Sequence, residues 1–281
     1  PRVKPPPKAS GIKVPFEYAP SADGIDENLL ILLHGLGDTH KPFAKLGKQL
    51  NLPQTAILAL RAPEQIPFLY DEEAFQWYTS FSDLGEPITH PNPAPALALL
   101  TTVLTHLTQA CCWQVHNIHL FGFAQGGSVA LEFAVAWWKS QKRESTSTPP
   151  APATSTPPLQ NATTSMASSR PTGSPLALAS VVSIAGPPLL QHALSSKCPT
   201  PLFLFHRAPP STTSSASSDA KRNFSDVREA TFVDAKAGES MPRSRDEWAP
   251  IMEFWSQRLT RRAPQADGVE GLYEVLSSGL P

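Results

Sequence analysis

Residues 118–128 read IHLFGFAQGGS, and this stretch decides the fold of the 281-residue chain. Its first half is a short apolar run, which is typical of a buried β-strand. Gly122, Gly126 and Gly127 surround position 124, and apolar residues at helical spacing follow from Ser128 onward. Glycines at such positions allow a tight turn and let a helix pack closely on the strand before it. The stretch therefore predicts a strand, a sharp turn and a helix.

A second stretch, residues 30–39, reads LILLHGLGDT and predicts a buried strand that runs into a loop containing Gly35 and Gly37. Either loop alone is also typical of an ordinary strand-to-helix turn. Together and in this order, the two stretches resemble the carboxylesterase and acyl-protein thioesterase branch of the α/β-hydrolases. Trp77, which follows the segment 61–63, resembles a further landmark of that family. The resemblance implies an α/β-hydrolase fold, with a mostly parallel central sheet and helices on both faces.

The rest of the chain alternates strand-like and helix-like patterns, as expected for a parallel sheet covered by helices. Continuous apolar runs predict strands at residues 29–33, 56–60, 118–121, 178–184, 201–205 and 230–233. Apolar residues at helical spacing predict helices at residues 42–50, 95–109, 128–139 and 245–259. Residues 11–18 alternate apolar and polar side chains, which predicts an added edge strand.

Composition predicts one folded domain with polar interruptions. We expect a single α/β-hydrolase-like domain at residues 10–261, a flexible N-terminal segment at 1–9 and a loose C-terminal tail at 262–281. Residues 143–175 are dominated by Ser, Thr and Pro. Such a segment has few apolar side chains to bury, so we expect a disordered insertion there. A shorter polar tract predicts a loop at residues 208–220.

Charge, hydropathy and cysteine content argue against several classes of protein. A formal net charge of −1 lacks the basic surface of a nucleic-acid-binding domain. No apolar stretch is long enough to predict a membrane span. Three cysteines do not suit a disulfide framework, and the N-terminal residues lack the hydrophobic region of a secretory signal. We therefore expect a cytoplasmic protein. No His, Cys or carboxylate spacing suits a metal, and neither a metal nor a cofactor is expected.

The resemblance also defines a catalytic triad that this sequence does not complete. The family places its nucleophilic serine at the position of Ala124, and a methyl group cannot attack a carbonyl. The family's base, a histidine, has no counterpart in residues 235–245, and its acid has none in residues 201–210. His206 matches a strand-end histidine of the family that is not the base. We interpret three vacant positions as natural loss of the triad.

Other parts of the family's site are retained. The resemblance implies an oxyanion hole made by the backbone N–H groups of Leu36 and Gln125. Tyr70, Phe75 and Trp77 belong to an aromatic cluster that could line a pocket for an acyl ligand or simply pack in the core. Asp38 and His40 could in principle activate a water, although the resemblance gives the aspartate of this loop a structural role.

Three hypotheses of different class remain open. The first is a catalytically inactive binding or scaffold protein, with a small acyl or ester ligand or a protein partner. The second is an active carboxylic-ester or thioester hydrolase in which Ala124 replaces the serine by engineering. The third is an interaction protein that acts through its Ser/Thr/Pro-rich insertion.

Overall fold

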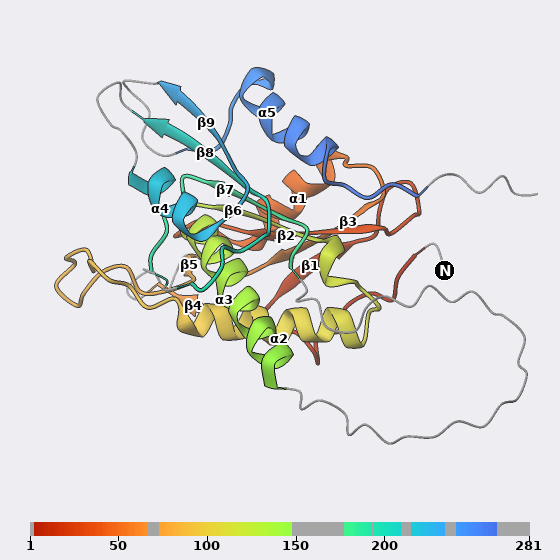
Figure 1. Cartoon of the computed structure of the whole chain (residues 1–281), viewed down its shortest axis with the longest axis horizontal. Coiled ribbons are helices and arrows are strands. Elements are labelled where there is room, and N and C mark those ends of the chain that lie inside the picture. Colours follow the sequence, from red (N-terminus) through yellow and green to blue (C-terminus); the bar gives the residue numbers. More distant parts are fainter. Residues whose placement is uncertain are drawn as a thin grey trace, which may run out of the picture.

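The structure is a computed structural model that describes residues 3–66, 73–147, 177–190, 192, 194–208, 215–233 and 240–262. Within these ranges, seven strands form one sheet in the order β1-β3-β2-β6-β7-β8-β9 (Figure 1). They are β1 Phe16–Ala19, β2 Asn28–Leu33, β3 Thr55–Leu60, β6 Ile118–Phe123, β7 Ser180–Ile184, β8 Leu202–Ala208 and β9 Val227–Val233. All neighbouring strands are parallel except β1, which pairs antiparallel with β3. The predicted mostly parallel sheet is confirmed.

The central strands form because their residues are apolar on both sides. Every residue of β2 and β3 is buried, which is the pattern of a parallel strand covered by helices on both faces. Strand β6 pairs with β2 in a register that sets Gly122 opposite Leu33. This register brings the ends of the two strands to the same edge of the sheet. The two glycine-rich loops consequently leave the sheet side by side.

Helices cover both faces of the sheet (Figure 1). They are α1 His40–Leu50, α2 Ala94–Gln109, α3 Gln125–Ser147, α4 Ser215–Asn223 and α5 Arg245–Ser256, with a 3₁₀ turn η1 Val115–Asn117 and a small strand pair, β4 Glu64–Gln65 and β5 Phe75–Gln76. One apolar cluster joins α2 and α3 to the sheet, and a second joins α1 and α5 to it. Each face therefore has its own core.

Two segments differ from the sequence predictions. Helix α3 continues to Ser147, beyond the expected start of the insertion at residue 143. Helix α4 occupies residues 215–223, where we expected a polar loop at 208–220; Ala220 is buried and Ser217 Oγ donates to Glu229, which anchors this short polar helix. The rest of the insertion, the loop residues 209–214 and the tail residues 263–281 lie outside the described residues.

The N-terminal segment expected to be flexible is packed on the fold from residue 3 onward. The Lys4 backbone N–H donates to Asp26 at 2.9 Å, and its ammonium donates to the Cys112 carbonyl at 2.9 Å. The same ammonium lies 4.9 Å from the Trp113 ring centroid. The sequence pattern missed this because the contacts come from a lysine and the backbone rather than from an apolar run.

Candidate functional site

The turn between β6 and α3 has the geometry of a strained elbow. Ala124 has φ 47°, a left-handed conformation that costs a residue with a Cβ about 1 kcal/mol or more. Its N–H donates to the Ile184 carbonyl at 2.8 Å, and its carbonyl accepts from Ser128 N–H at 3.0 Å. These two hydrogen bonds hold the strained residue between the sheet and the helix.

Glycines around the elbow make room for its backbone. A Cβ on Gly122 would lie 2.2 Å from the Gly126 carbonyl oxygen, and one on Gly126 would lie 2.3 Å from the Leu33 carbonyl oxygen. Real side chains do not tolerate such distances to backbone atoms. The glycines predicted from the motif are therefore sterically required at these two positions.

The first loop lies directly against the elbow. A Cβ on Gly35 would lie 2.8 Å from the Phe123 ring and 3.6 Å from the Ala124 methyl. Gly37 adopts φ 80°, and its N–H donates to the Phe75 carbonyl at 2.9 Å. Leu36, between these glycines, is 38% exposed. The structure thus brings the loop residues and position 124 together at one edge of the sheet.

A network of buried hydrogen bonds ties the two loops to Trp77. Its indole N–H donates to the His34 carbonyl at 2.8 Å, and its backbone N–H donates to the Gln125 side chain at 2.9 Å. Trp77 is fully buried and Phe75 is 7% exposed. Their burial is consistent with core packing, the pocket lining stays a prediction, and Tyr70 lies outside the described residues.

His34 anchors the start of the first loop. Its Nδ1 donates to the Gly35 carbonyl at 2.7 Å, while its Nε2 accepts from Ala62 N–H at 2.9 Å. Burial lowers the pKa of His34 to about 4, so the ring is neutral at physiological pH. Both ring nitrogens therefore form hydrogen bonds with backbone groups that stabilise the fold.

A largely buried ion pair joins the end of β8 to α5. The Arg207 guanidinium, near the end of β8, forms an ion pair with the Glu247 carboxylate of α5. Their side chains are 4% and 13% exposed. Glu247 also accepts from Arg243 N–H at 2.6 Å and donates its own N–H to Ser244. The ion pair fastens the last loop to β8.

The absence of the family's acid and base after β8 and β9 stays a prediction from the sequence. Residues 209–214 contain no carboxylic acid and residues 234–239 contain no histidine. His206 lies on β8, and burial lowers its pKa. None of the hydrogen bonds within the described ranges joins Asp38 to His40; the Asp38 carboxylate accepts from Thr39 N–H at 2.7 Å. Burial also lowers the pKa of His40.

Sequence reasoning missed two histidine pairs that span about 60 positions in the chain. His192 Nε2 lies 2.6 Å from a Glu132 carboxylate oxygen, and the other oxygen accepts from the N–H groups of Leu189 and Leu190 at 2.7 and 3.0 Å. His192 borders a cavity of about 690 Å³ that also includes His90. No local motif announces this pair, because it forms only when the loop after β7 packs on α3.

The second pair is His119 and Ser180, whose Nδ1 and Oγ atoms are 2.7 Å apart. Both residues are fully buried, and burial lowers the pKa of His119 to about 3. They are register partners near the starts of β6 and β7, whereas Ala124 follows the end of β6. The pair resembles part of a serine-hydrolase site in residue type, but a solvent-borne ester has no access to it in this structure.

The geometry agrees with comparisons to known proteins. A model of the family described as Phospholipase/Carboxylesterase matches residues 20–145. An uncharacterized hydrolase of Mycosarcoma maydis is 34% identical over 251 residues, covering 88% of this chain and 82% of that protein. The chain belongs to the phospholipase/carboxylesterase family of α/β-hydrolases. A second uncharacterized hydrolase, from Schizosaccharomyces pombe, is 32% identical over 108 residues, 37% of this chain and 44% of that protein.

Solved structures support the fold of this family member. Esterase PE8 superposes with a TM-score of 0.62 at 18% identity, covering 88% of this chain and 99% of that one. Acyl-protein thioesterase 2 of Zea mays superposes with a TM-score of 0.58 at 17% identity, covering 88% and 100%. At these identities the likeness concerns the α/β-hydrolase fold.

Two further features of the described residues bear on other chemistry. No helix within them is long and apolar enough to cross a membrane. Nor do they bring three His, Cys, Asp or Glu side chains together as a metal site would need.

Proposed function

We propose that this member of the phospholipase/carboxylesterase family binds an acyl or ester ligand at its elbow without hydrolysing it. The observation that carries the proposal is Ala124 itself, an alanine held at the strained turn where the family presents its nucleophile. Strain of this kind persists only where the surrounding structure maintains it. The backbone conformation of the elbow is thus kept, while the hydroxyl oxygen that would attack an ester is absent.

The binding half of the proposal relies on the two backbone donors. Gln125 is the first residue of α3, and the first N–H groups of a helix have no acceptor within the helix. Leu36 is partly exposed and follows Gly35, which lies against Ala124. An N–H from each could bind the carbonyl oxygen of an ester, which is the part of the site that survives without a nucleophile.

A direct test compares turnover with binding in the purified chain. We expect no burst and no steady-state release of p-nitrophenol from p-nitrophenyl acyl esters. We expect saturable binding of a non-hydrolysable long-chain alkyl methyl ketone, whose carbonyl mimics that of an ester. Ala124→Leu should abolish this binding by filling the elbow. Retained ketone binding in Ala124→Leu, or no ketone binding by the unmodified chain, would refute an acyl site here.

A second candidate function is hydrolysis through an activated water. It is favoured by the carboxylate-braced His192 at the border of a cavity, since such a histidine can accept a proton from water. The relatives named hydrolases are consistent with it. This candidate predicts esterase activity that resists fluorophosphonates, falls at least tenfold in His192→Gln and is unchanged in the exposed-histidine control His116→Gln.

The third hypothesis, action through the Ser/Thr/Pro-rich segment, concerns residues 148–175 outside the described structure. Deleting that segment separates it from the first proposal. A protein that binds at the elbow should keep its acyl ligand after the deletion, whereas a protein that acts through the segment should lose its partner.

A further inference from the structure

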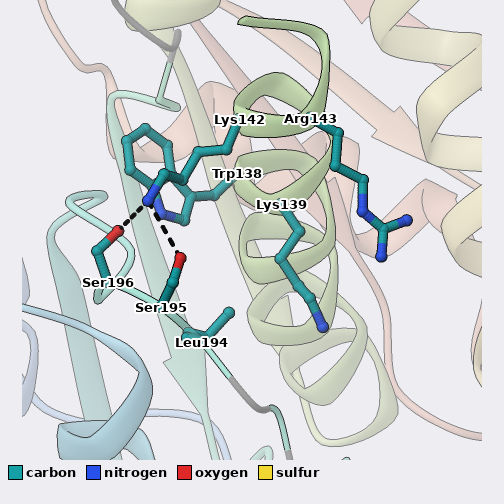
Figure 2. A pocket seen from close by; sticks show the side chains of 7 residues that line it. All are labelled: Trp138, Lys139, Lys142, Arg143, Leu194, Ser195 and Ser196. Carbon is teal, nitrogen blue, oxygen red and sulfur yellow. Dashed lines mark hydrogen bonds between the residues drawn. The ribbon is translucent and has the colours of Figure 1, made fainter. Parts of the chain in front are cut away.

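A hollow lies beside the C-terminal half of α3, away from the elbow. It encloses about 400 Å³ between α3 and the turn that precedes β8 (Figure 2). Its lining residues are Trp138, Lys139, Lys142, Arg143, Leu194, Ser195 and Ser196. Trp138 is 13 positions past Gln125, which corresponds to about 20 Å along the helix. The hollow is therefore separate from the acyl site proposed above, and its size suits a small ligand.

The polar groups that line this hollow are mainly donors. Among the described residues that line it, three side chains are cationic and none is acidic, although the whole chain has a net charge of −1. The Lys142 ammonium donates to Ser196 Oγ at 2.6 Å and to Ser195 Oγ at 3.3 Å (Figure 2). Lys139 and Arg143 also line an adjoining hollow with Ala136 and Ser140, and none of the described residues that line it is acidic. Positive charge is thus concentrated on this side of α3.

One further donor in the wall has no acceptor. The indole N–H of Trp138 is buried and makes no hydrogen bond with any part of the chain that the structure describes. Trp138 is 9% exposed, and the Lys142 ammonium lies 5.8 Å from its ring. Leaving a buried N–H unpaired costs about 1–3 kcal/mol, so an acceptor supplied by a ligand would relieve a real penalty. The unpaired indole N–H is thus an observation independent of the three cationic side chains.

We propose that this hollow binds the phosphate group of a small soluble phosphate monoester. Such a group carries close to two negative charges and oxygens that accept hydrogen bonds, which match the ammonium, the two hydroxyls and the indole N–H. Lys139 and Arg143 add attraction at longer range. A carboxylate offers one charge and two oxygens, which satisfy fewer of these donors.

The test measures binding of inorganic phosphate and of glycerol 3-phosphate by titration calorimetry at constant ionic strength, with glycerol as the uncharged comparison. We expect one saturable site per chain for both phosphates and none for glycerol. Lys142→Gln should weaken binding at least tenfold, and Trp138→Phe, which removes the indole N–H, should weaken it severalfold. The matched control Lys45→Gln removes one exposed charge on α1 and should leave the affinity unchanged.

Three results would overturn the proposal. The first is equal affinity in Lys142→Gln and Lys45→Gln. The second is the absence of a saturable site for either phosphate at this constant ionic strength, which would indicate only non-specific attraction to surface charge. The third is binding to vesicles that carry phosphoinositides without binding to either soluble phosphate. Lys142→Gln alters a side chain at the surface, so it tests the site even if Trp138→Phe lowers stability.

Discussion

At position 124 the backbone has the left-handed turn of an elbow, while the side chain is a methyl group. The turn is maintained by neighbours that have no side chain at all. Gly126 packs against the Leu33 and His34 carbonyls, and Gly122 packs against Gly126. At the residue scale, the turn therefore depends on the absence of side chains at Gly122 and Gly126, while its own residue carries only a methyl group.

Gly126→Ala tests how tightly the elbow is packed. Its Cβ would meet two backbone carbonyl oxygens within 2.5 Å, and backbone atoms cannot move aside cheaply. We expect a loss of about 3 kcal/mol in the free energy of unfolding, measured by urea denaturation. Gly24→Ala is the control: it meets no atom within 4 Å and has only its positive φ to disfavour it, so it should cost about 1 kcal/mol. Equal losses in the two variants would contradict tight packing.

Buried histidines predict a pH dependence of stability. Burial lowers the pKa of His34 to about 4 and that of His119 to about 3, against 6.5 when exposed. Below pH 6.5 these histidines become protonated in the unfolded chain but stay neutral in the folded one. Protonation therefore favours the unfolded state, and stability falls as pH falls. From pH 7 to pH 5 each histidine should remove about 2 kcal/mol. His119→Asn should remove its share of this slope, and an unchanged slope would show that His119 does not contribute.

At the element scale, the sequence patterns predicted the strands of the main sheet and four of its helices. They succeeded because buried parallel strands are apolar on both faces and because α1, α2, α3 and α5 have apolar residues at helical spacing. Helix α4 was missed because its sequence, SASSDAKRN, has no apolar stripe. The elbow was predicted from glycines that lie close in sequence, whereas the His192–Glu132 pair needs contacts between distant segments.

The ion pair between β8 and α5 should contribute to stability. Glu247→Gln removes the charge that accompanies the largely buried Arg207 guanidinium. We expect a loss of about 3 kcal/mol, measured by urea denaturation, because a buried charge without its partner is costly. Arg207→Met combined with Glu247→Leu should recover most of it. Failure of the double variant to recover stability would mean that the pair contributes through other contacts.

At the scale of the whole molecule, one sheet separates two apolar cores. The chain before β1 is hydrogen-bonded to other parts of the fold. Lys4 bonds to Asp26 and Cys112, and Lys8 N–H donates to His106 of α2 at 3.1 Å. Pro7 is buried in the same segment. The contacts of Lys4 with Cys112 and of Lys8 with His106 join parts of the chain about 100 positions apart, which is why no local pattern revealed them.

Removing residues 1–9 should therefore destabilise the folded domain. We expect the loss of these contacts to lower Tm by several degrees, since about 1 kcal/mol corresponds to 2–4 °C at this size. Scanning calorimetry of the full and shortened chains measures the shift. Lys4→Gln should account for part of it, and an unchanged Tm in the shortened chain would show that the segment adds no stability.

The central claim concerns the whole site, and fluorophosphonate labelling of Ala124→Ser tests it most directly. Labelling requires a serine activated by a base, so a restored hydroxyl without a histidine beside it should react no faster than an ordinary exposed serine. Mass spectrometry of the peptide that contains position 124 measures the labelling. We predict that it is negligible in both the unmodified chain and Ala124→Ser. Rapid, stoichiometric labelling of Ala124→Ser would contradict the account, because it would show an intact base and acid awaiting a nucleophile.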